Sequence, residues 1–108
     1  MKGPCNTPEL GPDAAEHAAE ILKALAHPIR LRLLTRLLRQ EDYVSRLARE
    51  LSVSQPVISQ QLGVLKSHGL VRSETRDGYA WSSVCEPHLG SMLDCICRCM
   101  ASRRGGKA

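Results

Sequence analysis

The chain has 108 residues and a mass of 11.9 kDa, the size of one small domain with a modest core. Its net charge of +4 and isoelectric point near 9.0 favour partners that carry phosphates, although many basic proteins bind no nucleic acid. No apolar run follows Lys2, and Arg32 and Arg36 interrupt the leucine-rich stretch 31–38, so we expect a cytoplasmic protein with neither a signal peptide nor a membrane span.

Two helices are expected in the first third of the chain. Apolar residues at helical spacing predict one helix over residues 12–26 and a second over residues 29–39. Pro28 suits the first turn of the second helix because its missing N–H would be unpaired there in any case. The second helix also carries an arginine stripe that we expect to be mostly a solvated charged face: Arg32, Arg36 and Arg39.

The segment from Leu47 to Leu65 is the most informative part of the chain. A short amphipathic helix runs into a tight turn, which Val53 fills, and a second helix then opens with small polar residues. The pattern predicts a helix-turn-helix whose second helix enters a DNA major groove, with an ordinary helical hairpin as the alternative. The side chains expected to meet base edges and phosphates are Ser54, Gln55, Pro56, Ser59, Gln60 and Gln61.

A β-hairpin is expected directly after this motif. Gly69 is well placed to end the preceding helix in a left-handed conformation. Residues 70–75 and 79–84 read as strands, and an Asp-Gly pair between two such runs is a strong hairpin signal. A hairpin at this place is a wing, whose tip carries Arg76 toward the minor groove or the DNA backbone. The predicted fold class is therefore mainly α with a small β-hairpin, a winged helix-turn-helix.

Two blocks of sequence carry a family resemblance. They are LKALAHPIRLRLL at residues 22–34 and SQPVISQQLGVLKSHGLV at residues 54–71, and together they resemble the arsenic-repressor-type (ArsR/SmtB) family of bacterial metal-sensing repressors. The resemblance covers roughly residues 15–95. It implies a homodimer formed through the first and last helices, a recognition helix beginning near Ser54, and release of operator DNA when a metal or metalloid ion binds. His27 and Ser52 depart from the family pattern, which usually has Asp or Asn before the proline and Gly in the turn.

The chain has five cysteines, and four of them lie near its C-terminus. Thiols stay mostly reduced in the cytosol, so structural disulfides are not expected. On a helix Cys95 and Cys99 share a face whereas Cys97 points almost oppositely, so one helix cannot bring all three to one ion. Two last helices packed around a dimer axis can do so. We predict a ligand role rather than simple burial for Cys85, Cys95, Cys97 and Cys99, and an incidental role for Cys5.

The softness of thiolate ligands suggests the inducer. Thiolates favour As(III), Sb(III), Cd(II), Pb(II) and Cu(I), and they also bind Zn(II). Trivalent arsenic and antimony need only three thiolates, whereas cadmium or zinc needs a fourth ligand, which His88 or Glu86 could supply. We therefore predict a repressor that As(III) or Sb(III) releases from DNA. A response to cadmium, lead or zinc and a thiol-redox (persulfide) response are the alternatives.

Other functional classes fit the residues less well. A metal-storage or chaperone role for the CxCxC run would leave the helix-turn-helix idle, and no nucleophile-base pair, phosphate loop or carboxylate pair indicates an enzyme. We expect a flexible arm over residues 1–11, one DNA-binding and dimerisation domain over 12–102, and a basic tail over 103–108. The expected partners are double-stranded operator DNA and a second copy of the chain, with no membrane.

Overall fold

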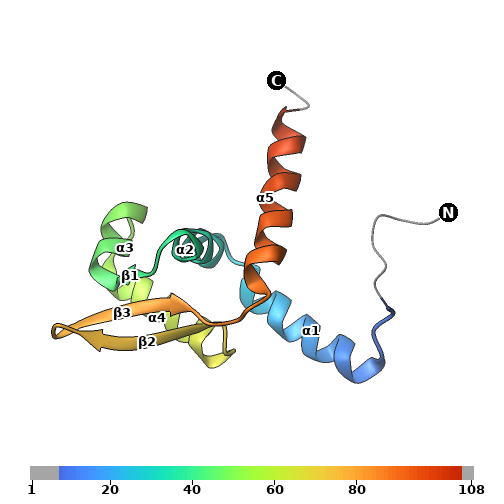
Figure 1. The fold of residues 1–108 in the computed structure, drawn as a ribbon, viewed down its shortest axis with the longest axis horizontal. Helices are drawn as coiled ribbons and strands as arrows, with labels where there is room; N and C mark the ends of the chain where they lie inside the picture. Colours follow the sequence, from blue (N-terminus) through green and yellow to red (C-terminus); the bar gives the residue numbers. More distant parts are fainter. Residues whose placement is uncertain (1–7, 106–108) are drawn as a thin grey trace.

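The computed structural model describes residues 8–105 and has the helical order and wing that the sequence predicts (Figure 1). One short strand and the exact ends of some helices differ from the prediction. The elements are α1 (Pro12–Leu25), α2 (Pro28–Arg39), β1 (Asp42–Tyr43), α3 (Val44–Leu51), α4 (Gln55–Ser67), β2 (Val71–Arg76), β3 (Tyr79–Val84) and α5 (Leu89–Gly105). The fold is a winged helix-turn-helix. Among the described residues, no helix combines the length and the apolar character needed to cross a membrane.

Two unusual residues identified in the sequence have clear local roles. His27 precedes α2, and its Nδ1 atom accepts a hydrogen bond from the backbone N–H of Ile29 at 3.1 Å, so the imidazole caps the helix as an Asp or Asn side chain would. Ser52 ends α3 in the left-handed conformation, with φ 58° and ψ 44°. The position thus has the backbone geometry that favours glycine, and serine adopts it at a cost.

The sheet has three antiparallel strands in the order β1-β3-β2. In the hairpin Val71 lies opposite Val84, and the two-residue turn is formed by Asp77 and Gly78, both with positive φ. The sequence predicted this hairpin but not β1, which pairs through Asp42 and Tyr43 with the outer edge of β3. β1 joins the α2–α3 connection to the wing.

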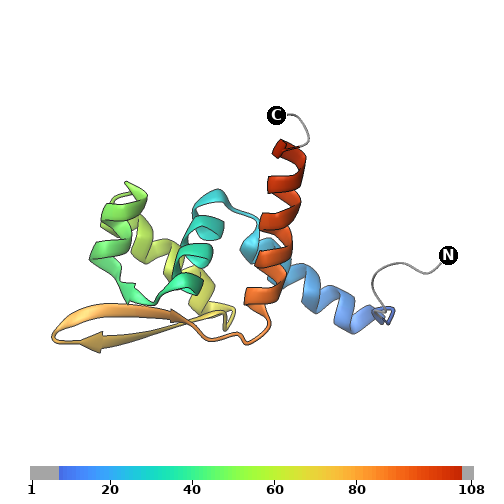
Figure 2. The ribbon, with the colours of Figure 1, turned by 45° about the horizontal axis from the view of Figure 1, so that its top comes forward.

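An aliphatic core surrounds α2, which packs against α1, α3, α4, α5 and β3. Figures 1 and 2 show the wing, α3 and α4 at one end of the molecule and α1 and α5 at the other. α5 enters the core only through its first turns, where Leu89 and Leu93 are each 1% exposed. Its later residues are exposed, including Ile96 and Met100. The predicted tail boundary at 103 is not a structural one, because the helix continues to Gly105.

We expect the substitution Ser52→Gly to stabilise the protein. Relief of the left-handed serine should raise the free energy of unfolding by about 0.5–1 kcal/mol, net of the greater freedom of glycine in the unfolded chain. Ser45→Gly, at an exposed position in the first turn of α3, is the control and should lower it by no more than roughly 0.5 kcal/mol. Urea unfolding followed by circular dichroism measures both, and equal losses in the two variants would contradict the assignment of strain to Ser52.

Candidate functional site

The polar start of α4 forms the predicted recognition surface. Of the predicted contact residues, those that are exposed are Ser54, Gln55, Pro56, Ser59 and Gln60. The opposite face of the helix is buried against the core through Ile58, Leu62 and Leu65. Ser54 is the N-cap residue, but its hydroxyl makes no capping hydrogen bond, so it remains available to a ligand. A continuous polar surface on a firmly packed helix is suited to a DNA major groove.

Gln61 differs from the other predicted contact residues. Its side chain is half-buried, and its Oε1 atom accepts a hydrogen bond from Nε of Arg30 on α2 at 2.8 Å. Gln61 lies at the border between the polar and buried faces of α4. The sequence analysis placed it with the outward-facing residues because it showed no partner for the side chain. The structure corrects that expectation in part, since one end of the amide is committed to the protein.

Arg76 at the end of β2 is held by acidic and aromatic neighbours. Its Nε atom donates to Glu74 at 2.7 Å, and Nη2 lies 3.7 Å from Oε1 of Glu41. The guanidinium carbon lies 4.1 Å from the ring centre of Trp81, whose Nε1–H donates to Glu41 at 2.8 Å. The hydrogen bond to Glu74 is the main reason that the pKa of Arg76 is raised. The wing therefore carries Arg76 as a paired cation, an arrangement that the sequence analysis did not address.

The three aromatic residues of the chain all lie on this wing side of the molecule. Tyr43 meets Trp81 edge to face, with ring centres 4.8 Å apart, and meets Tyr79 at 6.4 Å. The hydroxyl of Tyr43 donates to Asp77 in the wing turn at 3.3 Å, and burial together with this bond raises the pKa of the tyrosine. Edge-to-face pairs are favourable, so the cluster stiffens the wing against β1.

Arginines of α2 hold the first helix of the motif. The side chain of Arg36 is 13% exposed, pairs with Asp42, and donates to Glu50 of α3 at 2.7 Å. That hydrogen bond is the main reason that the pKa of Glu50 is lowered. Arg32 donates to the carbonyl oxygen of Leu51 at 3.0 Å. The expectation of a mostly solvated arginine face is therefore wrong for Arg36, because its acidic partners come from β1 and α3, outside the helix that carries it.

The four predicted cysteine ligands are not gathered within one copy of the chain. Cys85, between β3 and α5, is half-buried, and its Sγ atom donates to the carbonyl oxygen of Gly69 at 3.4 Å. Cys95, Cys97 and Cys99 are exposed on α5. Residues 8–105 contain no group of three or more His, Cys, Asp or Glu side chains arranged to hold a metal ion. Cys5 lies outside the described residues.

The α5 cysteines occupy two different sides of the helix. Cys97 lines a groove of ≈ 510 Å³ between α2 and α5, together with Leu31, Thr35 and Met100. Cys95 and Cys99 are one turn apart on another side, separated by about 6 Å along the axis. The predicted auxiliary ligand His88 precedes α5 rather than starting it, and its Nδ1 atom lies 3.3 Å from Oε2 of Glu86.

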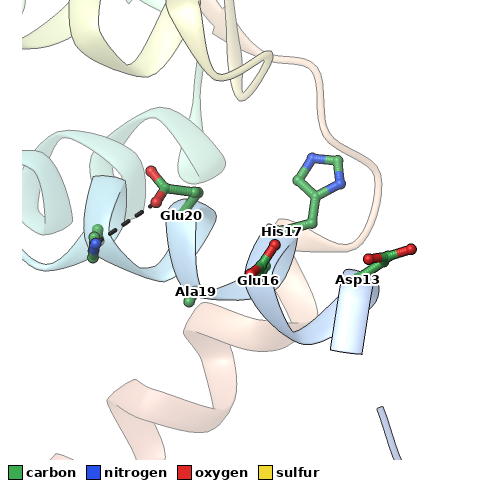
Figure 3. A pocket seen from close by; sticks show the side chains of 6 residues that line it. Asp13, Glu16, His17, Ala19 and Glu20 are labelled. Atoms are coloured by element: carbon green, nitrogen blue, oxygen red, sulfur yellow. Dashed lines mark ion pairs between the residues drawn. The ribbon is translucent and has the colours of Figure 1, made fainter. Parts of the chain in front are cut away.

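A second hollow runs along α1, away from the α4 surface. Figure 3 shows its acidic side chains on successive turns of one helix. It is open to solvent, has a volume of ≈ 550 Å³, and contains one ion pair, Lys23 to Glu20 at 3.6 Å. Its lining residues are Asp13, Glu16, His17, Ala19, Glu20 and Lys23. A surface of this charge repels phosphate, so this hollow does not suit DNA.

The family is decided by comparison with known proteins. The model of the arsR family of bacterial regulatory proteins matches residues 27–73, which run from the cap of α2 into β2. The biofilm growth-associated repressor of Agrobacterium fabrum is 47% identical over 82 residues, which are 76% of this chain and 70% of that protein. The chain belongs to the ArsR family. The fold and the family resemblance that the two sequence blocks indicated are thus confirmed.

Further comparisons add one sequence relative, matched over a shorter part of its length, and two solved structures. The biofilm growth-associated repressor of Xylella fastidiosa (strain Temecula1) is 45% identical over 62 residues, and the chain spans about half of it, 53%. The crystal structure of the repressor BigR from the same species has a TM-score of 0.72 and 31% identity, covering 78% of this chain and 86% of that one. The antimony-specific repressor AntR superposes with a TM-score of 0.79 over 92% and 91% of the two chains, but at 23% identity it shows the fold alone. These names all describe repressors, in agreement with the expectation that the chain is not an enzyme.

Proposed function

We propose that this protein is a transcriptional repressor that binds operator DNA as a homodimer and releases it when As(III) or Sb(III) binds its C-terminal cysteine thiolates. The observation that carries the DNA-binding part is the exposed polar surface at the start of α4, laid over a buried aliphatic face. This surface lies within the residues that the arsR-family model matches. The names of the relatives, which are repressors, support the same function.

The exposed apolar side chains of α1 and α5 support a homodimer. Leu22 of α1 is 53% exposed, and on α5 Met92 and Ile96 are 37% and 41% exposed. Both helices lie at the end of the molecule opposite the wing tip (Figure 2). A second copy packed on them would bury these side chains and present two α4 helices. Two such helices must lie about 34 Å apart to enter successive major grooves of one DNA face.

The positions of the thiols support a sensing site shared by two copies. Cys95 and Cys99 flank Met92 and Ile96 on the exposed side of α5, so a two-fold axis there brings thiols from both copies together. With antiparallel α5 helices, Cys85 at the start of one lies near Cys97 or Cys99 of the partner subunit. Three thiolates from this set satisfy the trigonal pyramid that As(III) and Sb(III) adopt.

Release of DNA follows from coupling between the thiol site at the α5 helices and the two α4 helices. An ion that binds one arrangement of the α5 helices more tightly shifts the population toward that arrangement, by no more than its difference in affinity. Because α5 packs on α2, and α2 on α4, a change in the α5 pair alters the separation of the two recognition helices. A mismatch with the spacing of the grooves weakens both contacts at once.

The first test is fluorescence anisotropy of the protein on the DNA upstream of its own gene, with a thiol reductant present, titrated with As(III) and Sb(III). We expect tight binding without metalloid and release at micromolar metalloid. Binding that survives both ions would contradict the metalloid proposal and leave cadmium, lead, zinc and persulfide as the candidates to titrate next. A chain that binds no duplex at all would contradict the repressor proposal itself.

The substitution Cys99→Ser should separate sensing from DNA binding. Loss of one thiolate leaves the α4 surface intact, so we expect unchanged affinity for the duplex and at least a tenfold higher metalloid concentration for release, since soft ions bind hydroxyl oxygen poorly. Cys5→Ser is the matched control and should respond as the unaltered chain does. The same anisotropy titration measures all three proteins. Release at unchanged concentrations in Cys99→Ser would place the thiol site elsewhere.

The pairing of Arg76 with Glu74 should weaken DNA binding at the wing. Glu74→Gln removes a carboxylate that competes with phosphate for the guanidinium, so we expect tighter binding of the duplex and a salt dependence steeper by about one phosphate contact. Glu16→Gln makes the same charge change on α1, in the hollow of Figure 3, and serves as the control. Anisotropy at several salt concentrations gives both slopes. Equal effects of the two variants would mean that Arg76 makes no phosphate contact.

A further inference from the structure

Arg30 joins three helices at the edge of the α4 surface. It lies in the first turn of α2, where Nη1 donates to the carbonyl oxygen of Ala24 in the last turn of α1 at 3.2 Å. Its Nε atom donates to Oε1 of Gln61 on α4 at 2.8 Å. Both Arg30 and Gln61 are half-buried. Within the described part of the chain, Gln61 is the one polar side chain of α4 that another element holds by a hydrogen bond.

The chemistry of this bond fixes the orientation of the amide. A guanidinium group carries five N–H donors and no acceptor, so only the oxygen of the Gln61 side chain can face it. An amide on an open helix surface can turn either end toward a ligand, because its oxygen and nitrogen are nearly equal in shape. Gln61 cannot do so without losing the bond to Arg30. Its NH₂ group must therefore point away from Arg30, and the edge of the amide turned from Arg30 presents donors.

We propose that Arg30 is a positioning residue that makes Gln61 a donor-only contact to DNA. This inference rests on the proposed DNA-binding function and adds the chemistry of one contact. The NH₂ group of Gln61 binds a hydrogen-bond acceptor, which is either a phosphate oxygen or an acceptor on a base edge such as guanine O6 or N7. It does not form the two-point contact to adenine, which requires the oxygen and the nitrogen of the same amide.

A double-mutant cycle on duplex affinity tests whether Arg30 acts through Gln61. Methionine is the replacement at both positions because it keeps a similar length and removes every strong hydrogen-bonding atom. We expect Gln61→Met to weaken binding roughly tenfold, as loss of one good contact does, and Arg30→Met to weaken it less. The double variant should bind as Gln61→Met does. Losses that multiply in the double variant would show that Arg30 contacts DNA by itself and would overturn the proposal.

Rescue by lysine separates positioning from a general structural effect. Lysine is also a donor without an acceptor, so Arg30→Lys can keep the Gln61 oxygen turned inward and should recover much of the affinity lost in Arg30→Met. In the Gln61→Met background the lysine should give no recovery. Recovery of the same size in both backgrounds would mean that charge alone explains the effect, against the proposal.

The same variants show whether the acceptor bound by Gln61 is a phosphate oxygen or an atom on a base edge. Affinity is measured on a duplex selected from a randomised pool by the unaltered chain and on a scrambled duplex of the same length and composition. An equal loss on both in Gln61→Met identifies a phosphate, and a loss confined to the selected duplex identifies a base edge. No loss on either would overturn the proposal.

Folding and the proposed function are checked separately. Thermal unfolding is recorded for every variant, and if Arg30→Met does not fold, Arg30→Gln, whose amide can still donate to Ala24, takes its place in the cycle. Should the unaltered chain bind no duplex, the DNA-binding function fails. If the unaltered chain binds and the cycle is additive, only the role of Arg30 fails.

Discussion

The burial of the aliphatic face of α2 is the constraint on which the rest of the structure depends. Leu33 and Leu34 are completely buried there, and each contributes about 1.5–3 kcal/mol relative to an exposed side chain. α1, α3, α4, α5 and β3 all pack against this one helix. Polar side chains of α2 add directional contacts to this apolar packing. Arg30 near the start of the helix binds α4, and Arg36 near its end binds α3 and β1. One helix thus sets the position of both helices of the DNA-binding motif.

The two ends of the molecule differ in how much of their apolar surface a single copy buries. At the wing end the apolar faces of α3 and α4 are buried and Arg76 is paired with Glu74, so the surface proposed to bind DNA already exists in one chain. At the other end α5 leaves the core after Leu93, and its apolar residues and three cysteines remain exposed. In the proposed dimer, a ligand that requires several thiolates has its site where two chains meet, so ligand binding and assembly would be parts of one equilibrium.

The sequence predicted those features that depend on neighbouring residues and missed those that depend on distant ones. Pro28, Gly69 and the Asp-Gly turn act over a few residues, and the helices and hairpin formed where these signals placed them. β1 has two residues, too few to show a period, and it exists because it pairs with β3. The inward turn of Gln61 depends on Arg30, 31 positions earlier. The grouping of the cysteines across two copies stays a prediction, since Cys95, Cys97 and Cys99 lie on two sides of α5 and one copy does not bring them together.

The gathering of all aromatic rings at the wing has a consequence for spectroscopy of this protein. Trp81, Tyr43 and Tyr79 are its only strong near-ultraviolet chromophores, and the core around α2 contains none of them. Intrinsic fluorescence and near-ultraviolet circular dichroism therefore report on the hairpin and β1, and they are blind to rearrangement of α1 and α5. A metalloid bound to the thiols of α5 would change the tryptophan emission only if it caused a conformational change that reached the wing. The native chain thus carries its own optical probe at the end away from Cys95, Cys97 and Cys99, where a signal from an ion bound to these three thiols measures transmission rather than occupancy.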